Sequence, residues 1–162
     1  MDEMVLRSMA KWPDVPAVYG WLMLDRRGNW LLRNPARSAY ERIGNVKLRE
    51  FIARTYAVDE RGRWFFQNGP QRVFVRLAYT PLVLRTAGDA YLDHCGRPFD
   101  CTGAMLDDEG SILLSGSRGI ALLDDRDLQR YADALGEAAG RLPTIACGEV
   151  QARFGFVADP VP

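Results

Sequence analysis

The chain has 162 residues, of which 48% are apolar and 26% charged, and a formal net charge of zero. Its length suits one domain or two very small ones, and its composition excludes a disordered, collagen-like or coiled-coil protein. The longest stretch without a charge, Val15–Leu24, is half as long as a membrane-spanning helix. The acids of Met1–Met4 are atypical of a signal peptide, and three cysteines are too few for a disulfide framework. We therefore expect a cytoplasmic protein with no membrane partner.

A short motif recurs along the chain, and its first copy is the first predicted element. Leu24–Leu32 and Val58–Phe66 share the pattern apolar-Asp-x-x-Gly-x-Trp-apolar-apolar, and Leu106–Leu114 is a weaker copy. An Asp carboxylate accepts hydrogen bonds from backbone amides two or three residues later, and Gly adopts the positive φ that closes the loop. Each copy is therefore predicted to be the tip of a hairpin rather than a calcium loop, which needs many more oxygen ligands.

An amphipathic helix is predicted between the first two copies, over Asn45–Tyr56. Asn45 is a favourable N-cap, and the residues that follow recur at helical spacing. The stripe consists of Leu48, Phe51, Ile52, Thr55 and Tyr56. Because this stripe should cover a sheet, the first part of the chain is a hairpin-helix-hairpin unit with Trp30 and Trp64 on equivalent strands.

The segment Gln71–Leu77 alternates as a strand with two different faces. One face carries Val73, Val75 and Leu77, and the other carries Arg72, Phe74 and Arg76. Further short strands are predicted at residues 82–84, 91–95, 104–106, 112–114 and 120–123, with a closing strand at 149–157.

A second helix is predicted after Asp124 or Asp125, ending near Gly140. Its stripe consists of Leu128, Tyr131, Ala132, Leu135 and Ala139. Together the elements predict an α+β fold of two small, mostly antiparallel sheets built from repeated hairpin-helix units, each with a packed helix.

The charges divide near residue 85. Residues 25–85 hold thirteen basic and five acidic side chains, whereas residues 86–162 hold six basic and thirteen acidic ones. We therefore expect a basic hairpin-helix-hairpin subdomain at 1–85 and an acidic, strand-rich subdomain with one C-terminal helix at 86–162, together one compact unit. Three arrangements remain open: the basic face is covered by the acidic half, pairs across a homodimer, or is open to anions. A nucleic-acid partner is not favoured, because the isoelectric point is near 6.6.

Four segments carry a resemblance to known proteins: LDRRGNW, GNVKLREFIARTY, DERGRWFFQNGPQRVFVRL and TPLVLR. They resemble an uncharacterised proteobacterial family known only as a domain of unknown function. They are distantly similar to a larger bacterial family with the pattern D-G-x-W, a basic helix, D-x-x-G-x-Y/W and a P-x-x-x-V-x-V strand. The larger family implies an α+β fold with repeated motifs and a suggested part in signal transduction, and it implies no catalytic residue.

The histidine and the cysteines are the candidates for metal or thiol chemistry. His94, Cys95, Cys101 and Cys147 form a Cys₃His set, the right number and type for structural zinc. The gap of five residues between Cys95 and Cys101 is too long for a zinc knuckle, so we expect no metal and no cofactor. A thiol enzyme around His94, Cys95 and Cys101 needs one thiol within reach of the imidazole.

The candidate ligand-binding residues are Arg63, Arg72, Phe74, Arg76 and Arg85. Guanidinium groups beside an aromatic ring can pair with and stack on a small anion at once. The sequence favours a non-enzymatic cytoplasmic binding or interaction module with a small anionic ligand or a protein partner. The alternatives are a small-anion sensor that uses this Arg/Phe sheet face and a metal- or thiol-dependent enzyme.

Overall fold

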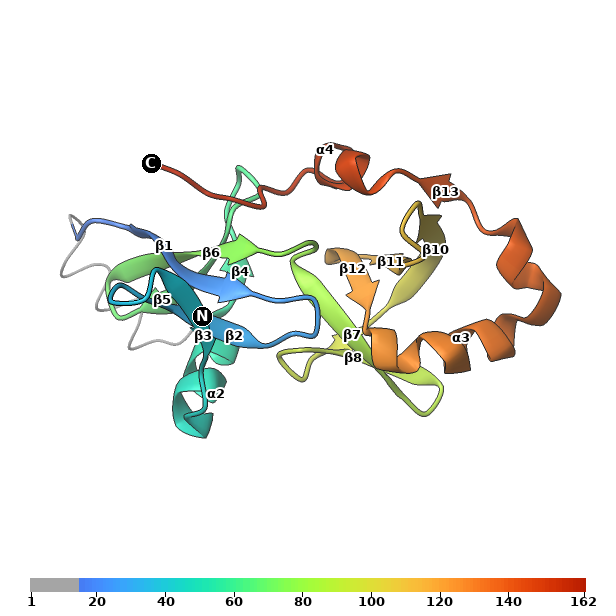
Figure 1. The fold of residues 1–162 in the computed structure, drawn as a ribbon, viewed down its shortest axis with the longest axis horizontal. Helices are drawn as coiled ribbons and strands as arrows, with labels where there is room; N and C mark the ends of the chain where they lie inside the picture. Colours follow the sequence, from blue (N-terminus) through green and yellow to red (C-terminus); the bar gives the residue numbers. More distant parts are fainter. Residues whose placement is uncertain (1–14) are drawn as a thin grey trace. The chain divides into compact units, whose positions relative to one another are not determined.

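A computed structural model describes residues 15–162, so the acidic Met1–Met4 lies outside the described residues. The described residues form two units: one contains 15–25, 29–78 and 156–162, and the other contains 26–28 and 79–155 (Figure 1). Each unit has its own sheet, and the α+β prediction is confirmed. The predicted boundary at residue 85 rests on charge and stays a prediction.

The sheet of the first unit has six strands in the order β3-β2-β1-β6-β5-β4. The strands are β1 (Val18–Leu24), β2 (Trp30–Asn34), β3 (Ala39–Arg42), β4 (Ala57–Val58), β5 (Trp64–Asn68) and β6 (Gln71–Leu77). Two antiparallel three-stranded meanders meet at β1 and β6, which pair in parallel. The C-terminal residues belong to the same unit: the Leu77 amide donates to the Ala158 carbonyl at 2.7 Å and the Val157 amide to the Gly62 carbonyl at 2.8 Å.

The sheet of the second unit has seven strands in the order β13-β10-β11-β12-β7-β8-β9. They are β7 (Leu82–Ala87), β8 (Ala90–Asp93), β9 (Pro98–Phe99), β10 (Cys101–Asp107), β11 (Ile112–Gly116), β12 (Gly119–Leu123) and β13 (Thr144–Ile145). Here too, two meanders meet: β7, the first strand of β7-β8-β9, pairs in parallel with β12, the last strand of β10-β11-β12. The antiparallel hairpins were predictable from turn residues, whereas a parallel pair leaves no turn signal in the sequence.

The helix α2 (Val46–Thr55) begins where predicted, because the Asn45 side chain accepts a hydrogen bond from the Leu48 amide at 3.0 Å. Its C-terminal end packs on the sheet. Tyr56 lies between the rings of Trp30 and Trp64, with ring centres 5.0 and 4.9 Å away. The predicted stripe is too long at its start, since Leu48 remains 39% exposed.

Four Asp-x-x-Gly turns share one pattern of hydrogen bonds. One carboxylate oxygen of Asp25, Asp59, Asp93 and Asp107 accepts from the amide four residues later, at 2.7–2.9 Å. The other oxygen accepts from a side chain: Asn29, Arg63, Arg118 and Tyr79, respectively. The predicted hairpin tips are confirmed, and the turn at Asp93 is a further one, 34 residues after Asp59. The motif did not predict this turn, because Pro98 occupies the position at which the copies beginning at Asp25 and Asp59 have Trp.

The second unit ends in short helices rather than in the predicted strand. Helix α3 (Leu128–Leu135) follows a short 3-10 helix, η1 (Asp125–Asp127). It ends at Gly136, whose φ is +58°, where a second 3-10 helix, η2 (Gly136–Arg141), begins. The predicted strand at 149–157 is wrong: Val150–Phe154 forms helix α4. Val150 and Phe154 have helical spacing, and periodicity does not separate helix from strand in so short a run. No helix within residues 15–162 is long and apolar enough to cross a membrane.

Candidate functional site

The predicted Arg/Phe sheet face exists in the first unit. The Arg63 guanidinium lies 4.4 Å from the ring centre of Phe74, and that of Arg72 lies 4.2 Å from the ring centre of Phe65. Phe74 is buried and stacks on Tyr19, with 4.9 Å between ring centres. Because β5 and β6 pair Phe65 with Phe74, the two cation–π contacts lie side by side.

Three of the four candidate arginines already have a carboxylate partner. Arg63 donates to Asp59 at 2.8 Å, Arg76 lies 3.9 Å from Asp159, and Arg85 donates to Asp127 at 2.7 Å. Arg72 makes no ion pair within the described part of the chain. The structure therefore brings Arg63, Arg72 and Phe74 together, whereas Arg85 belongs to the other unit and serves its fold.

The thiols are held in their protonated form. Burial raises the pKa of Cys95 to about 12 and also raises that of Cys101, and a hydrogen bond to Asp108 raises the pKa of Cys147. The Nδ1 of His94 accepts a hydrogen bond from the Val83 amide at 3.2 Å. Residues 15–162 contain no group of three or more side chains placed to hold a metal ion. Within the described part of the chain, His94 and the three cysteines therefore do not come together as one four-ligand cluster.

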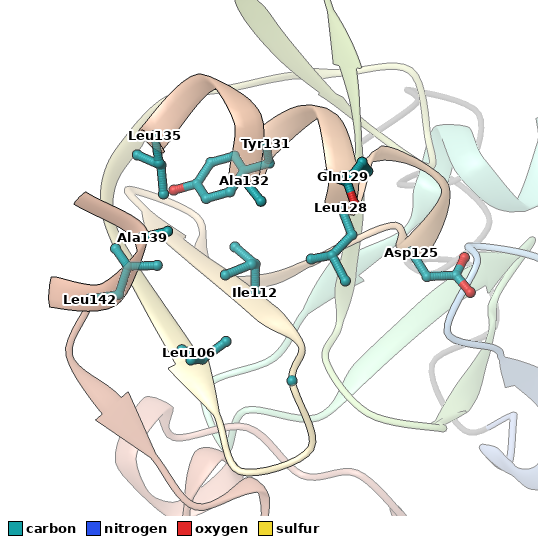
Figure 2. A pocket seen from close by; sticks show the side chains of 11 residues that line it. Leu106, Ile112, Asp125, Leu128, Gln129, Tyr131, Ala132, Leu135, Ala139 and Leu142 are labelled. Atoms are coloured by element: carbon teal, nitrogen blue, oxygen red, sulfur yellow. The ribbon is translucent and has the colours of Figure 1, made fainter. Parts of the chain in front are cut away.

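An apolar groove of about 460 Å³ lies in the second unit, between α3 and the strands β10 and β11 (Figure 2). Its apolar lining consists of Leu106, Ile112, Leu128, Tyr131, Ala132, Leu135, Ala139 and Leu142. In Figure 2, Ile112 on the sheet and Leu128 on the helix point toward one another. No side chain of α3 is fully buried, so the predicted stripe is correct in position but lines a groove instead of closing a core.

The start of α3 is fixed by two buried acids. Asp124 caps the first turn by accepting from the Arg126 amide at 2.9 Å, and its oxygens pair with the Arg126 guanidinium at 2.9 and 2.6 Å. Asp127 accepts from Arg85 and from the amide of Thr86 on β7 at 2.7 and 3.0 Å. The contacts of Asp127 tie the start of the helix to β7, and the apolar stripe that follows is half-exposed.

The described side chains inside the groove carry no charge. Burial raises the pKa of Tyr131, so the phenol stays neutral at physiological pH. Asp125, at the rim, is paired with Arg27 through two contacts of 3.0 Å, and its carboxylate points away from the apolar side chains in Figure 2. Gln129 is the other polar side chain that residues 15–162 contribute to the lining. Such a surface suits an apolar molecule or the apolar part of one.

We expect Asp127→Asn to destabilise the protein at neutral pH and to do so less in acid. Hydrogen bonding from Arg85 holds the pKa of Asp127 below its ordinary value of 3.8, against the effect of burial. The carboxylate therefore stabilises the fold above the unfolded pKa, and this contribution is lost as the pH falls through the folded pKa. Urea unfolding between about pH 6 and pH 2 should show the gap to the wild type closing. A gap that stays constant, or one equal to that of the exposed Asp89→Asn, would contradict this.

The comparisons with known proteins place the chain in a family. The family described as "Protein of unknown function (DUF2946)" matches residues 1–161. The chain belongs to this family. The part of the resemblance that pointed to a domain of unknown function is thereby confirmed. No curated protein matches the chain.

Two solved structures are similar to this chain. A DUF1285 family protein from Silicibacter pomeroyi DSS-3 has a TM-score of 0.53 and 16% identity, over 74% of this chain and 72% of that one. A DUF1285 family protein from Shewanella baltica OS155 has a TM-score of 0.48 and 16% identity, over 70% of this chain and 91% of that one. At 16% identity, the similarity to the Silicibacter pomeroyi protein concerns the fold alone.

Proposed function

We propose that the chain is a non-catalytic binding domain that takes the apolar body of a small molecule into the groove of the second unit. The observation that carries the proposal is the apolar stripe of α3, which faces β10 and β11 across an uncharged cavity. While the groove is empty, the apolar stripe stays exposed to water. Each Å² of apolar surface that a ligand covers contributes about 25 cal/mol to the free energy of binding.

The size and lining of the groove define the ligand class. A volume of about 460 Å³ lies within the range of about 300–1,000 Å³ typical of small-molecule sites. The walls are mainly aliphatic, and Figure 2 shows Asp125 and Gln129 at one end of the groove and the Tyr131 hydroxyl toward Leu135. The fitting ligand has an aliphatic or aromatic body and one polar end that stays hydrated.

Filling the groove is expected to weaken ligand binding. Ala132 and Ala134 are both exposed on α3, but only Ala132 lines the cavity. Ala132→Phe should weaken the binding of Nile red, an apolar fluorescent probe, by at least about tenfold, because the ring occupies the ligand's space. Ala134→Phe is the matched control and should bind the dye as the wild type does.

The dye titrations would be paired with thermal-shift measurements on medium-chain alcohols and carboxylic acids. Unfolding midpoints of the two variants identify any loss of binding that comes from misfolding. Equal binding by Ala132→Phe and Ala134→Phe, with both folded, would overturn the proposal. So would an absence of dye binding and of any shift with the panel in the wild type.

A second candidate is the small-anion sensor at the Arg/Phe sheet face. The observation in its favour is Arg72, whose guanidinium stacks on Phe65 and has no carboxylate partner among residues 15–162. Phosphate and small carboxylates in the same thermal-shift panel test it, because Arg72→Ala should remove any shift. A cytoplasmic location and a part in signalling belong to the proposal as well, on the three free cysteines and the distant resemblance.

A further inference from the structure

The sheet of the first unit has one face that α2 covers and another that carries arginines and aromatic rings. The end of α2 packs on the side of Leu24, because Tyr56 contacts the ring of Trp30 and Trp30 pairs with Leu24. Paired residues of a sheet point to the same side, and their chain neighbours point to the other. The strand registers therefore place eight residues together on the opposite face: Met23, Leu31, Arg33, Tyr40, Arg42, Arg72, Phe74 and Arg76.

This face is positively charged. Four of the eight residues are arginines, and none of the eight is acidic. Arg33, Arg42 and Arg72 make no ion pair within residues 15–162. Arg76 lies 3.9 Å from Asp159, and an exposed pair at that distance contributes little. The isoelectric point near 6.6 averages over the whole chain and does not describe this face, which attracts anions.

The cations are spread along the face rather than gathered at one point. Arg42 and Arg76 end a row of paired residues that runs through Leu31 and Met23 across β3, β2, β1 and β6. Three steps between neighbouring strands, each of about 4.8 Å, separate the two backbone positions by about 14 Å. An extended anion with several charges fits this spread better than a single phosphate does.

Two aromatic side chains of the same face lie beside these cations. Tyr40 belongs to β3, and its hydroxyl donates to the Gly20 carbonyl of β1 at 2.8 Å, so its ring lies across β2. Trp21 is 47% exposed, and alternation with the buried Leu22 places it on the side of Met23. Aromatic rings next to basic side chains are the surface on which proteins stack the bases of single strands.

We propose that this face binds single-stranded nucleic acid. Bases stack on Trp21 and Tyr40, and each base gains contact with a ring beside a cation. Phosphates pair with Arg33, Arg42 and Arg76, which are all exposed. An acidic peptide would use the arginines but has no group that the rings require. A flat lipid surface would meet the arginines before the half-buried apolar side chains between them could insert.

The test uses the full chain and a fluorescein-labelled oligouridine of about fifteen nucleotides, within the range that such surfaces cover. Affinity is measured by fluorescence anisotropy between about 50 and 200 mM salt. Each phosphate contact on a single strand contributes about 0.7 to the slope of log K against log salt. The triple variant Arg33→Gln/Arg42→Gln/Arg76→Gln should therefore lower the magnitude of this slope by about 2.

Replacement of the exposed ring separates stacking from charge. Trp21→Ala should weaken binding by at least about fivefold and leave the salt slope unchanged, because loss of stacking removes no phosphate contact. Trp21→Phe keeps a ring and should bind more tightly than Trp21→Ala. Unfolding midpoints of all variants identify any loss of binding that comes from misfolding.

Matched controls lie on the covered side of the sheet. Arg54→Gln removes an exposed arginine of α2, and Leu32→Ala removes an apolar side chain of β2 that is 44% exposed and pairs with Leu22. Both should bind the oligonucleotide within about twofold of the wild type.

Four outcomes would overturn the proposal. The first is no binding of the oligouridine at about 50 mM salt. The second is an equal loss of affinity in Arg54→Gln or Leu32→Ala. The third is unchanged affinity in a folded Trp21→Ala, which would mean charge attraction alone. The fourth is tighter binding of polyglutamate, of phosphatidylglycerol vesicles or of an RNA duplex of the same length. Nile red binding at α3 uses none of these residues, so the two proposals fail separately.

Discussion

Replacing Asp93 with alanine is expected to lower the free energy of unfolding of the second unit by about 3 kcal/mol. The Asp93 side chain is fully buried and accepts from the amides of Cys95 and Arg97, each at 2.9 Å. Its other oxygen accepts from Arg118 Nη1 at 2.6 Å. Alanine leaves two amides of a tight turn without an acceptor and removes the partner of a cation, and each loss carries its own cost.

Two further variants separate these contributions. Asp93→Asn retains an oxygen for the turn amides but not the charge, so we expect about half of the loss. Asp89→Ala removes an exposed acid from the neighbouring turn and should change stability by less than about 0.5 kcal/mol. The measurement is urea unfolding followed by circular dichroism. A midpoint for Asp93→Ala equal to that of Asp89→Ala would show that the turn does not depend on its carboxylate.

The second large effect is expected in the first unit, where Tyr56→Ala should cost about 4 kcal/mol. Tyr56 is 2% exposed, and its ring contacts both Trp30 and Trp64. Truncation removes the aromatic side chain that joins the two hairpins beneath the end of α2, and it leaves a cavity that large neighbouring rings cannot easily fill.

Near-ultraviolet circular dichroism is the most direct readout, because the tryptophans lose their fixed neighbour. Tyr56→Phe keeps the ring and should retain the aromatic signal and most of the stability. Val58→Ala, at a residue that is 46% exposed two positions later, should be near neutral. An unchanged aromatic spectrum in Tyr56→Ala would mean that the three rings do not form one cluster in solution.

Local signals in the sequence predict much of this fold. The Asn45 cap, the strand Gln71–Leu77 and the Asp-Gly hairpin tips all appear where their residues indicate, because each depends on hydrogen bonds within a few positions. The parallel strand pairs cannot be predicted from local signals. β1 and β6 meet across about fifty residues of chain, and nothing local to either strand records the pairing.

The candidate sites, too, are predictable only where they depend on local sequence patterns. Strand alternation correctly places Arg72 and Phe74 on one face of β6, where Arg63 also lies over Phe74. The acid that binds Arg85 could not be predicted, since Asp127 lies 42 residues away in the chain. The stripe of α3 was predictable as apolar, but its half-exposure depends on the position of the helix over the sheet, which no local pattern records. Helical periodicity identifies an apolar face without stating what, if anything, covers it.

The first unit gains its last backbone hydrogen bonds from residues 156–162, which the ribosome adds only after all of residues 79–155. The sheet of the second unit uses none of these C-terminal residues, so it can be complete in a chain whose first unit still lacks the partners of the Leu77 amide and the Gly62 carbonyl. A chain truncated after Gly155 is expected to keep a folded second unit beside a protease-sensitive first one.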